Sequence, residues 1–246
     1  MNRILIIGAT SSIALEYARL WAIQSATFFL VGRNIEKLED TARDLIVRGS
    51  SEVYKFQMDV NNIENHKIML DESSRLLGGI DIVLISHGTL PNQKDCEINT
   101  ELLLSEFSTN AVSTIGLLTI IANYLENQGF GSIGVITSIA GDRGRVSNYV
   151  YGSSKAAVSV FCDGLRIRLF KAGVSLTDIR PGYVDTPMTQ NLHLPSILVS
   201  KPKVIAKQIN KGIQNGKAVL YTPSYWAYIM AIIRFIPRII FRHMKL

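Results

Sequence analysis

A tyrosine and a lysine lie four residues apart in the stretch YVYGSSK, as Tyr151 and Lys155. This spacing places the two side chains on one face of a helix. A free tyrosine has a pKa of about 10, and a neighbouring ammonium group favours tyrosinate and lowers that pKa. The pair would supply the proton that a forming alkoxide needs in carbonyl reduction. Tyr149 is a rival proton donor, but Ser153 and not a lysine lies four residues after it.

A serine stands at the end of the strand that precedes this pair. Ser138 lies thirteen residues before Tyr151, and Pro181-Gly182 follows the next predicted strand. Carboxyl ends of neighbouring parallel strands meet at the ligand crevice of a sheet. We therefore expect Ser138, Tyr151 and Lys155 to meet there, with the Ser138 hydroxyl stabilising charge on a substrate oxygen. The alternative is a surface Tyr–Lys pair and a serine that caps a strand end.

Short apolar runs alternate with longer amphipathic segments along most of the chain. Strands are predicted at 3–7, 27–31, 53–57, 80–86, 132–138 and 174–179, and helices at 13–23, 35–48, 63–77, 100–127 and 151–172. This alternation is typical of a parallel sheet with helices on both faces. No linker or repeat divides it. We predict an α/β fold with a doubly wound parallel sheet of the Rossmann type, in a single domain (residues 1–222) with an amphipathic C-terminal tail (residues 223–246).

The first strand leads into IGATSSIA, where a dinucleotide-binding turn usually has three glycines. The first glycine permits the tight turn, the second a close approach to the pyrophosphate and the third close helix packing. Gly8, Ser12 and Ala14 occupy these positions. The Ser12 hydroxyl can bond a phosphate oxygen, and the helix N-terminus offers unpaired N–H groups. The alternative is an ordinary turn in which Thr10, Ser11 or Ser12 caps the helix. The turn alone does not decide between the two.

Taken in order, these motifs resemble the short-chain dehydrogenase/reductase family over residues 1–190. The resemblance rests on GATSSIA, Asp59-Val60, FSTNAVS, the Ser-Tyr-Lys set and PGYVDTPM. It implies a catalytic group of Asn110, Ser138, Tyr151 and Lys155, in which Asn110 holds a water that relays protons and Lys155 holds the nicotinamide ribose. The cofactor contacts that it implies are Gly8, Thr10, Ser11, Ser12, Ile13, Arg33, Asp59, Val60, Gly88, Tyr151, Lys155, Pro181, Val184 and Thr186. No metal site is predicted.

Two features depart from the family pattern. After the fourth predicted strand the chain reads Ile85-Ser86-His87-Gly88 where the family has Asn-Asn-Ala-Gly. Gly88 still allows a close backbone approach, but the asparagine that supports the neighbouring loop is missing. His87 either contacts the cofactor or packs within its loop. The second departure is the single glycine of the first turn, and together they indicate a divergent branch of the family.

The choice of cofactor depends on the end of the second strand. Binding of NAD uses an acid there for the ribose 2′-hydroxyl, whereas an arginine accommodates the 2′-phosphate of NADP. The chain has Gly32 at the acid position, followed by Arg33. We therefore predict NADP, with NADPH preferred over NADH. The alternative is that Arg33 is a solvated residue at a helix start.

The substrate end of the predicted crevice holds the stretch GDRGR. Arg143 and Arg145 are candidate substrate residues, because guanidinium groups suit phosphate oxygens. The alternative is that one of them pairs with Asp142. Residues 192–204 are rich in Leu, Ile and Val, and the family resemblance implies a mobile lobe there that covers the substrate. This composition favours an apolar or lipid-bearing substrate.

Positive charge is concentrated in the last quarter of the chain. The last acidic residue is Asp185, and residues 186–246 contain nine Lys and Arg. Arg234, Arg238 and Arg242 recur every four residues, and Lys245 follows them.

The tail also carries an uninterrupted apolar run of nine residues, 225–233. That run is shorter than the roughly 20 residues that span a bilayer. We predict an anchor in the membrane plane with Pro237 as a kink or helix start. The alternatives are a tail that packs on the core and an oligomer contact. The tail is too apolar for a nucleic-acid patch.

Cys96 and Cys162 are far apart in sequence, which fits reduced thiols. No secretory signal is recognised. We expect a cytoplasmic homo-oligomer at the inner membrane face that interconverts a ketone and a secondary alcohol. The resemblance favours a keto-sugar or lipid-linked sugar of cell-envelope polysaccharide synthesis as substrate. The alternatives are a reductase of fatty or sterol-like ketones and a non-catalytic dinucleotide sensor, against which the Asn, Ser, Tyr and Lys set argues.

Overall fold

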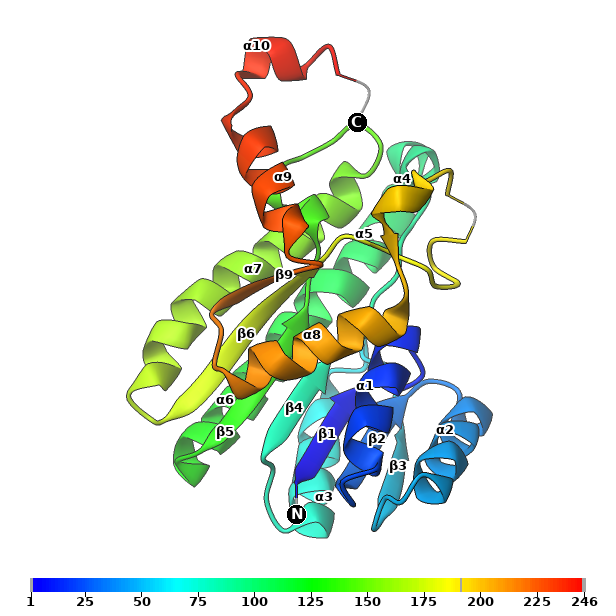
Figure 1. The fold of residues 1–246 in the computed structure, drawn as a ribbon, viewed down its shortest axis with the longest axis vertical. Helices are drawn as coiled ribbons and strands as arrows, with labels where there is room; N and C mark the ends of the chain where they lie inside the picture. The colour runs from blue at the N-terminus through cyan, green and yellow to red at the C-terminus, as the bar shows by residue number, and fades with distance from the viewer. Residues whose placement is uncertain (1, 191, 245–246) are drawn as a thin grey trace.

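A computed structural model describes residues 2–190 and 192–244. Seven strands form one parallel sheet in the order β3-β2-β1-β4-β5-β6-β9 (Figure 1). They are β1 (Arg3–Ile7), β2 (Thr27–Gly32), β3 (Val53–Gln57), β4 (Ile82–Ile85), β5 (Gly131–Ile136), β6 (Val174–Pro181) and β9 (Val219–Thr222), while β7 (Tyr183–Val184) pairs with β8 (Val199–Ser200) in a separate ribbon. The strand order reverses between β1 and β4, and this switch point opens a crevice at the carboxyl ends of the strands.

Helices cover the two faces of the sheet. One face carries α1 (Ser12–Ala22), α2 (Ile35–Val47) and α8 (Pro202–Gln214), and the other carries α3 (Glu64–Leu77), α6 (Ser113–Gln128) and α7 (Tyr149–Phe170). Two short helices, α4 (Gln93–Ile98) and α5 (Thr100–Phe107), precede α6, and α9 (Tyr225–Phe235) and α10 (Arg238–Phe241) form the tail. The predicted doubly wound α/β fold is confirmed.

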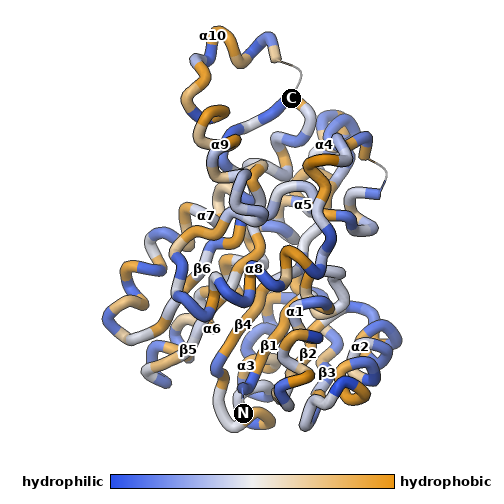
Figure 2. Tube along the Cα trace, viewed as in Figure 1, coloured by the Kyte–Doolittle hydropathy of each residue, from blue (hydrophilic) through white to orange (hydrophobic). Residues whose placement is uncertain are grey.

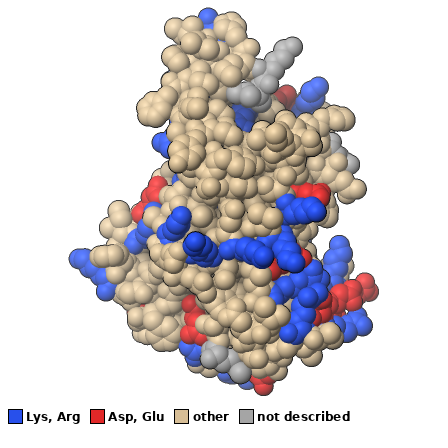
Figure 3. Space-filling view, viewed as in Figure 1, with Lys and Arg blue, Asp and Glu red and all other residues tan. Residues whose placement is uncertain are grey.

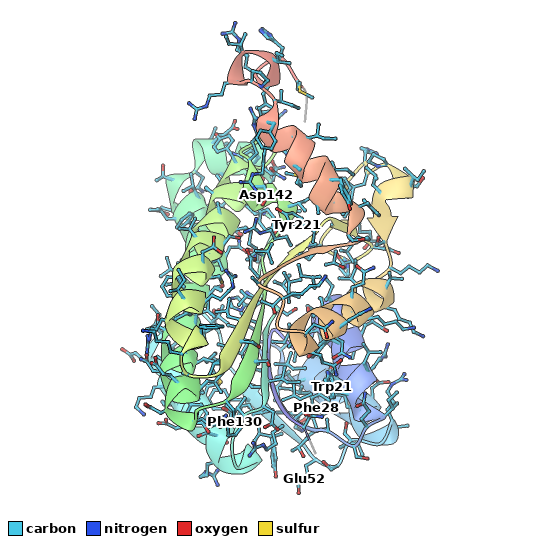
Figure 4. The ribbon with its side chains drawn as sticks, turned by 60° about the vertical axis from the view of Figure 1, so that its left-hand side comes forward. Trp21, Phe28, Glu52, Phe130, Asp142 and Tyr221 are labelled. Carbon is cyan, nitrogen blue, oxygen red and sulfur yellow. The ribbon has the colours of Figure 1, made fainter. Side chains whose placement is uncertain are left out.

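The core lies in two layers, one on each side of the sheet. On β1, Ile4 and Ile6 pack toward α1 and α2, whereas Leu5 and Ile7 pack toward α3 and α6. Such strands are buried on both faces and read as continuous apolar runs, which Figure 2 shows in the central strands. Figure 4 labels Trp21 of α1 and Phe28 of β2, which belong to the same layer.

One helical segment, Thr100–Gln128, is long and apolar enough to cross a membrane by length and composition. It is a core helix of the domain, because Leu117, Leu118 and Ile121 are fully buried against the sheet. The shorter apolar helix of the tail is Tyr225–Phe235.

The tail is half packed and half exposed. Trp226 and Met230 of α9 are buried against Ile139, which directly follows the predicted catalytic serine. Pro237 separates α9 from α10, and Figure 1 shows both helices projecting from one end of the domain. Lys245 lies outside the described residues.

Candidate active site

The turn after β1 brings backbone close to backbone. Gly8 has a φ of +81°, and a Cβ there would lie 2.5 Å from the backbone N of His87. Only glycine fits this crowded, left-handed position. Ser11 caps α1 by accepting a hydrogen bond from the Ala14 N–H (3.2 Å), and its hydroxyl oxygen lies 2.5 Å from that of Ser86. This pair of serines joins the first turn to the loop after β4, where the family asparagine is missing.

Ser138, Tyr151 and Lys155 line one cleft of about 470 Å³. Ser138 follows β5, and its hydroxyl accepts a hydrogen bond from the Ala140 N–H (3.1 Å) at the start of a short 3-10 turn, Ile139–Asp142. That turn packs against α7, which carries the other two residues. Lys155 Nζ donates to the Ile136 carbonyl (3.2 Å) and lies 5.7 Å from the centroid of the Tyr151 ring.

Asn110 lies in a π-helical turn, Ser108–Val112, between α5 and α6. Such turns occur frequently at functional sites. Asn110 does not line the cleft but clamps its rim, because its Oδ1 accepts the Thr89 N–H (3.0 Å) and its Nδ2 donates to Thr89 Oγ1 (3.1 Å). A Cβ on Gly88 would lie 2.8 Å from Asn110 Oδ1 and 3.2 Å from Lys155 Nζ. The absence of a side chain at Gly88 therefore leaves room for Asn110 Oδ1 and Lys155 Nζ.

Burial governs the protonation of the two central groups. It raises the pKa of Tyr151 to about 12, and the neighbouring Ser138 opposes this rise only in part. Burial also lowers the pKa of Lys155 to about 8, although the Asp178 carboxylate raises it. The net change in the pKa of Tyr151 is therefore upward, opposite to the lowering expected from the neighbouring ammonium, because burial is the largest contribution.

His87 is a packed loop histidine. Its Nε2 lies 3.0 Å from Ser113 Oγ and 3.1 Å from Thr114 Oγ1, both on α6. Burial, with Lys155 adding to it, lowers the pKa of His87 to about 3, so the ring is neutral near pH 7. These contacts agree with the packing interpretation, but His87 also lines the cleft, so contact with the cofactor stays an open alternative.

Most residues that the resemblance assigned to the cofactor line the same cleft. They are Gly8, Thr10, Ser11, Ser12, Ile13, Arg33, Val60, Gly88, Pro181, Val184 and Thr186. Asp59 is an exception, because it is exposed and its Oδ1 accepts the Asn61 N–H (2.9 Å) in a local turn. Met58 and Val60, the two neighbours of Asp59 in the sequence, line the cleft, and Asp59 does not.

The end of the cleft at β2 is basic. Gly32 offers no carboxylate, and a Cβ there would already lie 3.3 Å from Leu38. Arg33 and Lys37 line this end, and neither forms an ion pair within the described residues 2–190 and 192–244. Sequence reasoning missed Lys37, although its position four residues after Arg33 was a usable signal.

Arg143 and Arg145 do not lie in the cleft, and the expectation of a substrate role for them there is wrong. Arg143 donates to the carbonyls of Ile233, Arg234 and Ile236 at the end of α9. Arg145 is buried with its Nη2 3.3 Å from the sulfur of Met230. The tail helix occupies both guanidinium groups, and the alternative pairing with Asp142 is not formed either.

Asp142 instead belongs to a buried network that sequence reasoning missed. Arg180 pairs with Asp142 (2.9 Å) and Asp178 (2.7 Å), and Tyr221 donates to Asp142 (2.7 Å). Burial alone would lower the pKa of Arg180, but the two carboxylates outweigh it and raise that pKa. Figure 4 shows Asp142 and Tyr221 below the tail. The network connects β6, which flanks the cleft, to β9 and to the Ile139–Asp142 turn.

In the part of the chain that the structure describes, no three His, Cys, Asp or Glu side chains gather in an arrangement that could hold a metal ion. Cys96 and Cys162 are buried and unpaired.

Comparisons with known proteins agree with this arrangement. Residues 2–195 match the family model described as short chain dehydrogenase. The chain is 32% identical over 241 residues to an uncharacterized oxidoreductase of Mycobacterium tuberculosis, covering 98% of this chain and 96% of that protein. It is 28% identical over 216 residues to the ketoacyl reductase HetN of Nostoc, covering 86% and 75%.

The fold is also found among solved structures. The crystal structure of an actinorhodin polyketide ketoreductase variant with NADPH superposes with a TM-score of 0.80 at 22% identity, covering 89% of this chain and 95% of that one. The chain belongs to the short-chain dehydrogenase/reductase family, a family of NAD(P)-dependent enzymes that act on CH–OH and C=O groups.

Proposed function

We propose that this protein is an NADPH-dependent reductase that converts a ketone into a secondary alcohol. The observation that carries the proposal is the cleft in which Ser138, Tyr151 and Lys155 lie beside the turn of Gly8. Bound NADPH supplies the hydride. Tyr151 donates the proton to the forming alkoxide, and the Ser138 hydroxyl bonds the same oxygen. Lys155 holds the nicotinamide ribose. Asn110 positions the rim of the cleft at Thr89, and it also holds the water that relays protons to Lys155.

The cleft fits a dinucleotide phosphate. Gly8 and Gly88 leave backbone where a Cβ would clash, and the Ser12 hydroxyl is free to meet a phosphate oxygen. Arg33 and Lys37 are the residues that would hold the 2′-phosphate, since no carboxylate lies at Gly32 to repel it. Val184 and Thr186 would contact the nicotinamide. These features support NADPH over NADH.

Tyr151 is held in its protonated form, which is the form that donates a proton. Burial raises the pKa of Tyr151 to about 12, so the ring keeps its proton across the neutral range. Burial lowers the pKa of Lys155 to about 8, so its ammonium loses a proton more readily than that of a solvated lysine.

For the substrate we propose a keto-sugar, carried by a lipid. Met188 and Thr189 line the cleft, and the adjoining lobe exposes Leu192 and Ile197. The tail adds an apolar surface at the same end of the molecule, and we propose that it binds the cytoplasmic face of a membrane. The similarity to HetN, a ketoacyl reductase, and to the polyketide ketoreductase supports a fatty ketone as the second candidate.

Two further features of the molecule are part of the proposal. We divide the chain after Thr222, where the last strand of the sheet ends and the tail begins.

The side chains of three apolar residues on α7, Val160, Ile167 and Phe170, are exposed. They support a homo-oligomer, because an apolar helix face is suited to contact with a second copy.

The test compares two tyrosines of the same helix. Tyr151→Phe removes the proton donor and keeps the ring, so ketone reduction should be abolished while NADPH affinity stays within about twofold. Tyr149→Phe is the control, since Tyr149 is exposed and donates to Glu97 (3.2 Å) outside the cleft. NADPH consumption is measured with a keto-sugar, a polyprenyl-phosphate-linked keto-sugar and a fatty ketone. Near-normal turnover of the Tyr151 variant would refute the mechanism, and the ranking of kcat/KM decides between the substrates.

A further inference from the structure

A second cleft, of about 650 Å³, lies between the loop after the Ile139–Asp142 turn and the tail. It shares no lining residue with the catalytic cleft. Four arginines line it, Arg143, Arg234, Arg238 and Arg242, together with Asp142 and Phe241. Neither the reductase chemistry nor the cofactor uses this place.

The break at Pro237 brings the arginines together. A continuous helix would spread residues 234, 238 and 242 along one stripe over two turns. Instead α9 ends at Phe235, and the chain turns through Ile236 and Pro237 before α10 starts. The arginines on either side of this break therefore face one cleft.

Arg143 fixes the shape of the cleft. Its guanidinium donates to the Ile236 carbonyl (2.7 Å) and to those of Ile233 and Arg234, and its Cζ lies 3.8 Å from the centroid of the Phe241 ring. A cation at a helix C-terminus satisfies the last carbonyls and the helix dipole. Arg143 therefore holds α9 and α10 in place and completes the floor of the cleft.

The lining has a large excess of positive charge. Among the lining residues that the structure describes, Asp142 has the one acidic side chain, which is 1% exposed and already engaged by Arg180 and Tyr221. Arg234, Arg238 and Arg242 are exposed and form no ion pair with any residue that the structure describes. Arg242 Nε donates to the neighbouring His243 Nε2 (3.1 Å). Planar guanidinium groups have several donors each and suit the oxygens of a phosphate, which they bind through paired hydrogen bonds.

We propose that this second cleft binds a phosphate group. The surroundings favour the phosphate of a lipid, because Ile232, Phe235, Ile239 and Ile240 are all more than half exposed next to the arginines. Apolar side chains beside basic ones are typical of a helix that lies in a membrane interface. Figure 3 shows few acidic side chains on the end of the molecule that carries α9 and α10. The identification of the phosphate as that of a lipid depends on the proposed membrane attachment. The proposal of a phosphate site does not depend on it.

The experiment measures binding of the full-length protein without substrate. Inorganic pyrophosphate is titrated calorimetrically, and co-flotation is measured with phosphatidylcholine vesicles that contain either phosphatidic acid or oleate at matched surface charge. The variant Arg238→Gln with Arg242→Gln should lower phosphate-dependent binding about tenfold or more, because it removes charge-assisted hydrogen bonds.

The matched control removes the same charge elsewhere. Lys203 and Lys207 are exposed on α8. Figure 3 shows a row of basic side chains across the middle of the molecule, where α8 lies in Figure 1. Lys203→Gln with Lys207→Gln should change binding by less than about twofold, if general attraction to a charged surface is minor.

The outcomes separate the sources and the rival explanations. A tenfold loss toward phosphatidic acid vesicles alone supports a lipid phosphate, and a loss toward pyrophosphate supports a soluble one. Equal flotation with oleate and phosphatidic acid together with unchanged pyrophosphate binding in the arginine variant, or equal losses in the two double variants, would overturn the site. Tyr151→Phe should bind as the unchanged protein does, so a failed reductase proposal remains distinguishable from a failed phosphate site.

Discussion

Ser11 and Ser86 share a hydrogen bond of 2.5 Å between hydroxyl oxygens that are 75 residues apart in sequence. The bond joins the turn that begins α1 to the loop that ends β4. Both residues line the catalytic cleft. The hydrogen bond between the two serines connects these two loops. It takes the place of the support that the asparagine of the family pattern would give. A single glycine is therefore enough for this turn.

Loss of this tie should loosen the cofactor site. Ser86→Ala removes one hydrogen bond, worth about 0.5–1.5 kcal/mol, so NADPH affinity should fall about 3- to 10-fold. Ser74→Ala on α3 is the control, because its hydroxyl bonds only the nearby Asp71 carbonyl (2.9 Å). Fluorescence titration of NADPH measures the effect, and equal affinities of the two variants would show that the serine pair does not shape the site.

The basic end of the cleft should set the choice of cofactor. Arg33→Ala removes a charge-assisted phosphate contact of about 1.5–3 kcal/mol, so NADPH affinity should fall about tenfold or more while NADH affinity is little changed. Adding Lys37→Ala should deepen the loss for NADPH alone. Arg43→Ala, on the same helix and paired with Asp40 (2.6 Å), is the control. Parallel losses for NADPH and NADH would mean that Arg33 does not contact the 2′-phosphate.

Lys155 should reduce the stability of the cofactor-free protein. Its pKa is lowered from 10.5 to about 8, so the folded state disfavours the ammonium. In the unfolded chain Lys155 is an ammonium at any pH below about 10.5. The penalty is fully present below about pH 8 and disappears as pH rises to about 10.5. Lys155→Met should therefore raise the free energy of unfolding at pH 7 by up to about 3 kcal/mol, although it abolishes activity.

Urea unfolding at pH 7 and at pH 10 measures this gain, which should shrink at the higher pH. Lys171→Met is the control, since Lys171 is exposed. A gain that is the same at both pH values would show that packing and not charge is responsible.

The Arg180–Asp142 pair should matter for folding far more than a surface pair. The two side chains are 12% and 1% exposed. Arg180→Met leaves Asp142 and Asp178 buried without their cation, so we expect a loss of about 3–5 kcal/mol in the free energy of unfolding. Arg43→Met breaks a pair that is 74% and 72% exposed and should change stability by less than about 1 kcal/mol. Urea titration that gave similar losses for the two variants would contradict this ranking.

The sheet could be predicted closely, because buried parallel strands are uninterrupted apolar runs. The bounds of β1 and β3 agree with the predicted 3–7 and 53–57. The last strand, β9, and its helix α8 were missed, because VLYT is short and the segment before it resembled a lobe. Its place in the sheet depends on pairing with β6, which is distant in sequence.

The site was predicted where its parts are close in sequence and missed where they are not. Tyr151 and Lys155 share one helix turn, so spacing alone placed them together. Ser86, by contrast, meets Ser11 only through the folded sheet. Arg143 was assigned to the cleft because it follows Ser138 closely, but the end of α9, 90 residues later, occupies it.

The π-helical turn at Ser108–Val112 sets a length constraint on the chain. Each residue of an α-helix turns the chain by about 100° and advances it by about 1.5 Å. The additional residue of the wide turn shifts the phase between α5 and α6, so that α6 directs Leu117 and Ile121 inward while Asn110 faces the loop of Thr89. Deleting one residue here would merge the two helices and rotate everything before the deletion out of phase. Apart from Asn110, the number of residues in this segment therefore matters more for the fold than their types.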